Sequence, residues 1–228
     1  EVLSENTTTK LRAVQIRHQV QAAEREAEIH RLRNVELAQA YAELTALNAS
    51  LRDANEQKSR LLSQLERQTY EDALTGLANR RYLDLRLEEE FQRARRHHRS
   101  LAVAIADLDH FKRVNDSYSH AVGDEVLRAL ARILREQVRH TDLVARYGGE
   151  EFVLVLTETD REAALNACEK LRAAVEQHDW RSIHPDLAVT ISIGLAAETD
   201  VPGHEAMLAA ADEQLYAAKA AGRNCVRG

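Results

Sequence analysis

Acidic residues stand at the ends of two apolar runs and could together hold a divalent cation. The segment "RYGGEEF", Arg146–Phe152, places Glu150 and Glu151 directly after two glycines and between apolar stretches. Asp107 and Asp109 close another apolar run, "LAVAIADLD". Carboxylates that gather without a cation repel one another, whereas Mg²⁺ accepts a few hard oxygen ligands and leaves other positions to water and phosphate oxygens. These residues therefore indicate magnesium-dependent phosphate chemistry.

The glycines between the apolar runs predict a tight hairpin. Gly148-Gly149 suits a two-residue type I′ turn, which requires positive φ at both central positions. Such a turn pairs Arg146 with Glu151 across the strands. An ion pair between these side chains, with Glu150 left in solvent, is therefore the structural alternative to a metal site.

Of the acidic pair Asp107 and Asp109, one residue could have a purely structural role. Asp109 suits the N-cap position of a helix that starts at His110, which is a purely structural role. Asp107 has no comparable structural role at the end of a buried strand. Asp107 is therefore the stronger candidate for a metal ligand.

Other polar residues could complete a nucleotide site. Lys219 and Arg223 lie one helical turn apart in "YAAKAAGRN" and could bind phosphates, although cations are also favoured near the C-terminal end of any helix. Lys112, which follows the acidic strand, is equally ambiguous. Asn115 and Asp124 could hydrogen-bond a guanine edge, or could be a turn residue and a first-turn acid.

Composition restricts the possible partners. The 228 residues carry 31 Lys and Arg against 37 Asp and Glu, so a net charge of -6 gives no general attraction for nucleic acid or anionic membranes. Cys168 and Cys225 have neither CxxC nor Cys/His spacing, which fits a reducing cytosol and predicts no zinc or disulfide framework. No apolar run of about 18 residues and no signal-peptide pattern occurs, so this segment is not expected to enter a membrane. We expect a cytoplasmic protein.

A long helix is predicted for residues 1–69. From about Lys10 to Gln68 the chain has no Gly or Pro and is rich in helix-forming residues. Downstream of Leu37 the apolar positions step by three and four, which predicts a dimeric coiled coil; the alternative is one helix packed on its own domain. Upstream, Ile29 and Leu32 do not continue this register, which predicts a stutter or a change of partner near residues 33–36. The seam is Leu37, Ala40, Leu44, Leu47, Leu51, Ala54, Lys58, Leu61 and Leu65, with Lys58 as a polar register marker.

Residues 70–228 alternate between helical and strand patterns. Gly76 and Asn79 interrupt the first helix, and a new amphipathic helix runs to about His98. The expected fold class is α/β (α+β), with a mixed central sheet covered by helices. Strands are expected at 101–109, at 188–196 and in the hairpin 143–156, and helices at 110–116, 123–138, 161–177 and 204–222.

Several segments together resemble the GGDEF-domain diguanylate cyclases over about Tyr70 to Gly228. These segments are "DALTGLANRR", "DLDHFKRVNDSYSHAVGDEVL", "RYGGEEF", "ISIGLA" and "ADEQLYAAKAAGRN". The resemblance implies a fold like the palm of nucleotidyl cyclases and polymerases, preceded here by a coiled-coil helix. It also implies an enzyme that condenses two GTP molecules into cyclic di-GMP and two pyrophosphates.

The resemblance assigns roles by position. Mg²⁺, or Mn²⁺ in its place, would bind as two ions to Asp107, the carbonyl of Leu108, Glu150 and Glu151. Glu150 would also accept the proton of the attacking 3′-hydroxyl. The residues that would bind GTP are Phe111, Lys112, Asn115, His120, Asp124, Gly148, Gly149, Lys219 and Arg223. The RxxD pattern from Arg139 to Asp142 would bind cyclic di-GMP as an inhibitor.

The resemblance also implies a dimer, because the product is two-fold symmetric and each domain would hold one GTP. The coiled coil would join the two chains, and its register could control how the domains face each other. The chain begins without Met, so an upstream sensory domain is expected. Two other classes remain open: a receptor for GTP or cyclic di-GMP that has lost turnover, and a structural coiled-coil adaptor.

Overall fold

The computed structural model describes residues 2–228, with side chains described for 16–61 and 69–228. The chain divides into two compact units, Glu1–Ser63 and Gln64–Gly228. In the described part of the chain, no helix combines the length and the apolar character needed to span a membrane.

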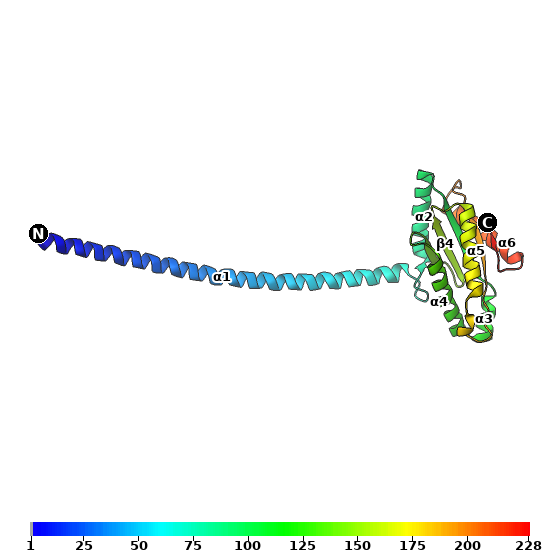
Figure 1. Ribbon diagram of the computed structural model, residues 1–228, viewed down its shortest axis with the longest axis horizontal. Coiled ribbons are helices and arrows are strands. Elements are labelled where there is room, and N and C mark those ends of the chain that lie inside the picture. The colour runs from blue at the N-terminus through cyan, green and yellow to red at the C-terminus, as the bar shows by residue number, and fades with distance from the viewer. Residues whose placement is uncertain (1) are drawn as a thin grey trace. The chain divides into compact units, whose positions relative to one another are not determined.

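The predicted long helix is confirmed as α1 (Val2–Tyr70), shown in Figure 1. The seam leucines with described side chains are all more than half exposed: Leu37 55%, Leu44 55%, Leu47 57%, Leu51 52% and Leu61 64%. Leu65 lies outside the residues whose side chains are described. The exposed leucine row over residues 16–61 fits a coiled-coil-like helix, because such a row normally packs against another helix.

The second unit contains the predicted mixed sheet. Among the described residues it has six strands in the order β1-β3-β4-β2-β5-β6. Neighbouring strands are antiparallel except for the parallel pairs β1–β3 and β5–β6. The strands are β1 (Ala78–Asn79), β2 (Leu101–Leu108), β3 (Leu143–Arg146), β4 (Glu151–Thr157), β5 (Ile191–Ala196) and β6 (Val226–Arg227).

Helices cover both faces of the sheet. One core lies between the sheet and α3, α4 and α5, and the other lies under α2 and α6. Alternate residues of the central strand β2 enter opposite cores: Ala104 the first, and Val103 and Ile105 the second. The helices are α2 (Arg80–His97), α3 (Phe111–Tyr118), α4 (His120–Gln137), α5 (Arg161–Gln177) and α6 (His204–Ala220), with a short 3₁₀ helix at Trp180–Ser182.

Gly194 determines how closely α6 approaches the sheet. A Cβ atom at Gly194 would lie 2.1 Å from both the carbonyl oxygen of Ala211 and the amide nitrogen of Leu215. Only glycine therefore allows the backbone of α6 to pack directly on β5. This close packing places Lys219, one turn beyond Leu215, over the end of the neighbouring strand β2.

Candidate functional site

Asp107 is a buried carboxylate at the end of β2. Asp107 is only 5% exposed, and its Oδ2 atom lies 2.8 Å from Nζ of Lys219. Burial raises the pKa of Asp107, and the hydrogen bond and positive charge of Lys219 offset part of this rise. The ionised form of Asp107 therefore depends on a nearby cation.

The carboxylates of the hairpin lie beside Asp107. Glu151 is directly opposite Asp107 in the β2–β4 pair, and the amide of Leu108 donates to the carbonyl of Glu150 at 3.3 Å. Burial raises the pKa of Glu150, and the charges of Asp107 and Glu151 raise it further, while Lys219 opposes the rise. The predicted convergence of acidic residues from the strand end and the hairpin is therefore present.

The donor set fits a hard divalent cation that is shared with a nucleotide. In the described parts of the chain, no group of three or more His, Cys, Asp or Glu side chains lies close enough together to hold a metal ion without other ligands. Mg²⁺ does not require such a group, because it is usually held by one or two carboxylates together with water and substrate phosphates. Asp107 and Glu151 supply paired carboxylates, and their repulsion with Glu150 favours a cation at this position.

The hairpin differs from the predicted type I′ turn. Arg146 pairs with Phe152, and the amide of Tyr147 donates to the carbonyl of Glu151 at 2.9 Å, so Gly148, Gly149 and Glu150 form the turn. Neither glycine is among the residues with positive φ. The predicted type I′ turn is therefore wrong, and the predicted strand register is wrong by one residue.

The proposed ion pair between Arg146 and Glu151 is also wrong. Arg146 Nη1 lies 3.1 Å from Oδ1 of Asp72, and Nη2 donates to the carbonyl of Gly149 at 2.7 Å. Partial burial alone would raise the pKa of Asp72, but hydrogen bonds from Thr75 and Arg146 outweigh it and hold the pKa below its usual value. Arg146 thus links the turn to Asp72 in the segment "DALT". The sequence motif did not predict this role.

Asp109 is not a helix N-cap. The helix α3 begins at Phe111 after His110, whose side chain makes no capping hydrogen bond. The carboxylate of Asp109 instead accepts hydrogen bonds from the hydroxyls of Thr190 and Ser192, both at 2.7 Å. It therefore faces β5 and the segment that precedes it, instead of the start of α3.

The candidate guanine-binding residues lie around the junction of α3 and α4. A Cβ atom on Gly123 would lie 2.0 Å from Oδ1 of Asn115, so the bare backbone of Gly123 leaves room for this amide. Asn115 therefore lies beside Gly123 and the adjoining Asp124. The remaining candidates here differ in exposure: Phe111 is buried, whereas Lys112 and His120 are exposed.

The candidate phosphate-binding cations lie at the C-terminal end of α6. Lys219 contacts Asp107 directly, and Arg223 lies close enough for its charge to lower the pKa of the same carboxyl. Gly148 belongs to the same neighbourhood, because a Cβ atom there would lie 2.7 Å from Oε2 of Glu151. The structure thus brings together most of the residues for which the sequence predicted metal and phosphate contacts.

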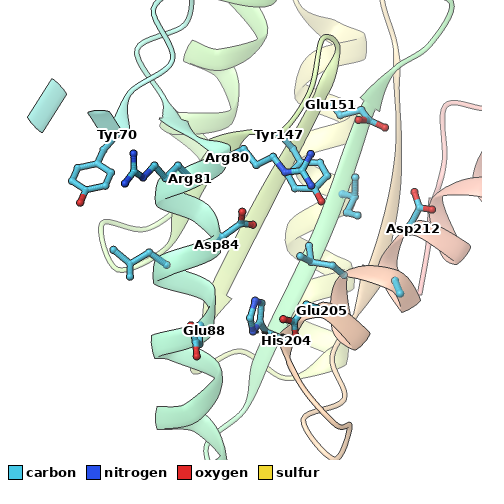
Figure 2. Close-up of a pocket in the computed structure, with 14 residues that line it drawn as sticks. Tyr70, Arg80, Arg81, Asp84, Glu88, Tyr147, Glu151, His204, Glu205 and Asp212 are labelled. Carbon is cyan, nitrogen blue, oxygen red and sulfur yellow. Dashed lines mark ion pairs between the residues drawn. The ribbon is translucent and has the colours of Figure 1, made fainter. Parts of the chain in front are cut away.

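A groove of about 910 Å³ extends from Glu151 between α2 and α6. Figure 2 shows the residues that line it, including Arg80, whose guanidinium carbon lies 4.5 Å from the ring centre of Tyr147. Neither residue was singled out from the sequence, although both belong to the quoted motifs. Their contact supports the hairpin next to Glu151 through a cation–π interaction.

The RxxD pattern forms a compact turn. The amide of Arg139 donates to Oδ2 of Asp142 at 3.1 Å, and Oδ1 of Asp142 accepts from the amide of Thr157 at 3.2 Å. A hollow of about 470 Å³ adjoins this turn and is lined by Arg93, Arg99 and Arg139 among others. Arg93 and Arg99 pair with Glu90 and Glu158, which line the same hollow, so an anion bound here would compete with these carboxylates for the guanidinium groups.

Comparison with known proteins agrees with the motifs. The family model described as "Diguanylate cyclase, GGDEF domain" matches residues 69–225. The chain therefore belongs to the GGDEF family of diguanylate cyclases, whose members generally use a divalent metal ion.

Curated relatives and solved structures support this assignment. Diguanylate cyclase DgcP of Pseudomonas aeruginosa is 39% identical over 207 residues, covering 91% of this chain and 30% of DgcP. Diguanylate cyclase DosC of Escherichia coli is 41% identical over 156 residues, covering 68% of this chain and 34% of DosC. The chain thus spans about a third of the length of these relatives.

One similar crystal structure contains the coiled coil and GGDEF domain of DgcB from Caulobacter crescentus in complex with c-di-GMP. It is 30% identical, has a TM-score of 0.70, and the match covers 79% of this chain and 98% of that one. The similarity confirms the expected palm-like fold of the family.

The raised pKa of Glu150 predicts a pH-dependent stability. Because the folded pKa exceeds the ordinary value of 4.5, the contribution of Glu150 to stability is complete below that pH and is lost as the pH rises through the folded pKa. Glu150→Gln should therefore melt at a higher temperature than the parent protein at pH 8 without divalent cations. This difference should shrink as the pH approaches 4.5.

Thermal unfolding followed by circular dichroism across this pH range measures the effect. Glu213→Gln, which neutralises an exposed carboxylate on α6, is the control and should leave the melting temperature unchanged. A Glu150→Gln variant that melts at or below the parent temperature at pH 8 would contradict the stated electrostatic repulsion.

Proposed function

We propose that this chain is an active diguanylate cyclase, which condenses two GTP molecules into cyclic di-GMP with release of two pyrophosphates. The observation that carries the proposal is the pairing of Asp107 with Glu151 at the end of the sheet, with Lys219 2.8 Å from Asp107. Membership of the GGDEF family and similarity to named diguanylate cyclases support the same reaction. Because the reaction uses GTP, we place it in the cytoplasm.

The carboxylates hold the metal and accept a proton in this proposal. Asp107, the carbonyl of Leu108, Glu150 and Glu151 would bind Mg²⁺, or Mn²⁺ in its place, as two ions. When bound, the ions supply charge neutralisation at the phosphates and lower the pKa of the attacking hydroxyl. Glu150 accepts the proton of the 3′-hydroxyl, a role that its raised pKa favours.

The remaining residues bind and orient GTP. Lys219 exchanges its contact with Asp107 for the terminal phosphates and binds them together with Arg223. Gly148 and Gly149 let backbone amides approach the phosphates. Apart from its chain neighbours, nothing lies within 4 Å of a Cβ position at Gly149, so the space beside this backbone is open. The guanine and its surroundings are contacted by Asn115, Asp124, His120, Phe111 and Lys112.

Direct assay of turnover tests the proposal. The chain incubated with GTP and Mg²⁺ should produce cyclic di-GMP, detected by chromatography and mass spectrometry. Asp107→Asn should reduce the rate by about 100-fold or more, because it removes a metal-binding charge at the reacting phosphate. Asp200→Asn, which changes an exposed loop residue in the same way, should retain the parent rate.

The possible outcomes separate the three classes of function. Binding of GTP or cyclic di-GMP without product would indicate a receptor that has lost turnover. A chain that binds neither nucleotide would indicate a structural adaptor. Equal rates for Asp107→Asn and the parent protein would remove Asp107 from the reaction.

We also propose that residues 1–69 form a dimeric coiled coil that brings two cyclase domains, 70–228, together. The exposed leucines of α1 and the coiled coil in the DgcB structure support this arrangement. Coiled-coil register would then control how the domains face each other, in response to an upstream sensory domain. In the turnover assay, the rate per chain should rise with chain concentration until the dimer is saturated, and a constant rate throughout the dissociating range would contradict the dimer.

We further propose that cyclic di-GMP inhibits the enzyme at Arg139 and Asp142. The position of Arg139 in the lining of the adjoining hollow supports the proposal, as do structures of relatives with c-di-GMP. Arg139→Ala should keep its basal rate and continue to turn over GTP when cyclic di-GMP is added, whereas Arg181→Ala, an exposed control, should be inhibited like the parent protein. Equal inhibition of both variants would place the inhibitory site elsewhere.

A further inference from the structure

The segment that follows α6 has an unfavourable backbone conformation with positive φ angles. Gly222 has φ +115°, and the next residues, Arg223 and Asn224, have φ 68° and 46°. Left-handed φ is easy for glycine and tolerated by asparagine, but it is unfavourable for an arginine because of its Cβ atom. The conformation of Arg223 must therefore be stabilised by contacts with the surrounding residues.

Asp109 provides the first of these contacts. It is only 7% exposed, and its Oδ2 atom accepts a hydrogen bond from the amide of Asn224 at 3.1 Å. The same carboxylate is held in place by the hydroxyls of Thr190 and Ser192. Hydrogen bonds to a carboxylate are stronger than those between neutral groups, so Asp109 ties the backbone next to Arg223 to the central sheet.

The side chain of Asn224 provides the second contact, with α5. Its Oδ1 atom accepts from Nη1 of Arg172 at 2.8 Å, and its Nδ2 atom donates to Oε1 of Glu176 at 2.7 Å. The side chain of Arg172 is only 14% exposed and is also paired with Glu169 and Glu176. Both ends of the Asn224 amide are therefore fixed by charged partners.

We infer that Asn224 is a positioning residue that, together with Asp109 and Arg172, fixes the backbone of Arg223 so that its guanidinium is presented to the triphosphate of GTP. The inference rests on the proposed function, which makes Arg223 a ligand of the terminal phosphates. It predicts that Asn224 contributes to triphosphate binding without touching the nucleotide. If Asn224 only held the C-terminal segment in place, its substitution would change the stability of the fold and would not affect the binding of one nucleotide more than another.

Binding measurements on the whole chain distinguish these roles. Asn224→Gly keeps the backbone N–H and tolerates the positive φ, but it removes both side-chain hydrogen bonds. In calorimetric titrations with Mg²⁺, the affinity for 3′-deoxy-GTP, which lacks the attacking hydroxyl, should fall about tenfold, the loss of one charge-assisted contact. The affinity for GMP, which has no terminal phosphates, should not change.

A double-mutant comparison tests whether Asn224 acts through Arg223. Arg223→Ala should weaken 3′-deoxy-GTP binding to a similar extent, and adding Asn224→Gly to it should cause no further loss. Glu169→Ala is the control, because it removes one partner of Arg172 and leaves Asn224 and Glu176 in place. It should bind 3′-deoxy-GTP like the parent protein.

Reversing a hydrogen bond supplies an independent test. Asn224→Asp places a carboxylate against Glu176 and should also weaken 3′-deoxy-GTP binding. Adding Glu176→Gln reverses the donor and the acceptor of this contact, so the double variant should recover most of the parent affinity. Recovery of the 3′-deoxy-GTP affinity in the double variant, with GMP affinity unchanged in both variants, would support a positioning role.

Each contrary result has a defined meaning. Equal losses of GMP and 3′-deoxy-GTP affinity in Asn224→Gly, or additive losses in the Arg223→Ala background, would overturn the inference. Parent-like binding by Asn224→Gly while Arg223→Ala binds weakly would overturn it and leave the proposed phosphate site intact. Parent-like binding by Arg223→Ala would overturn both the inference and the proposed role of Arg223.

Discussion

The contact between Asp107 and Lys219 is the interaction on which the candidate site depends. Asp107 is only 5% exposed, so its carboxylate is costly to ionise, and the ammonium group 2.8 Å away offsets part of that cost. Two features of the fold bring Asp107 and Lys219 together. The central strand β2 ends at the required position, and Gly194 allows α6 to approach β5 closely enough for Lys219 to reach Asp107.

The same electrostatic requirement connects the free protein to the proposed reaction. In the free protein, Lys219 balances part of the negative charge that Asp107, Glu150 and Glu151 create together. A metal ion arriving with GTP would take over this role and would leave Lys219 available to the phosphates. In the proposed reaction, the repulsion within the acidic group would favour binding of the metal and nucleotide.

The sequence was sufficient where the controlling interactions are local or periodic. Apolar periodicity predicted the helices, the four longer strands and the mixed sheet, and the acidic strand ends indicated the candidate site. The two-residue strands β1 and β6 were not predicted, because two residues are too short to show a period. The hairpin was predicted one residue out of register because its turn is fastened by Arg146 to Asp72, a residue far away in the sequence. Asp109 was misassigned for the same reason: its partners Thr190, Ser192 and Asn224 come near it only in the folded chain.

The most direct measurement of the central claim is a crystal structure of the chain with Mn²⁺ and 3′-deoxy-GTP, in which anomalous scattering locates the manganese. We expect a manganese peak at coordination distance from both Asp107 and Glu151, with Lys219 moved from Asp107 to the terminal phosphates. Manganese bound elsewhere, or Lys219 still paired with Asp107 while the nucleotide is in place, would contradict the central claim.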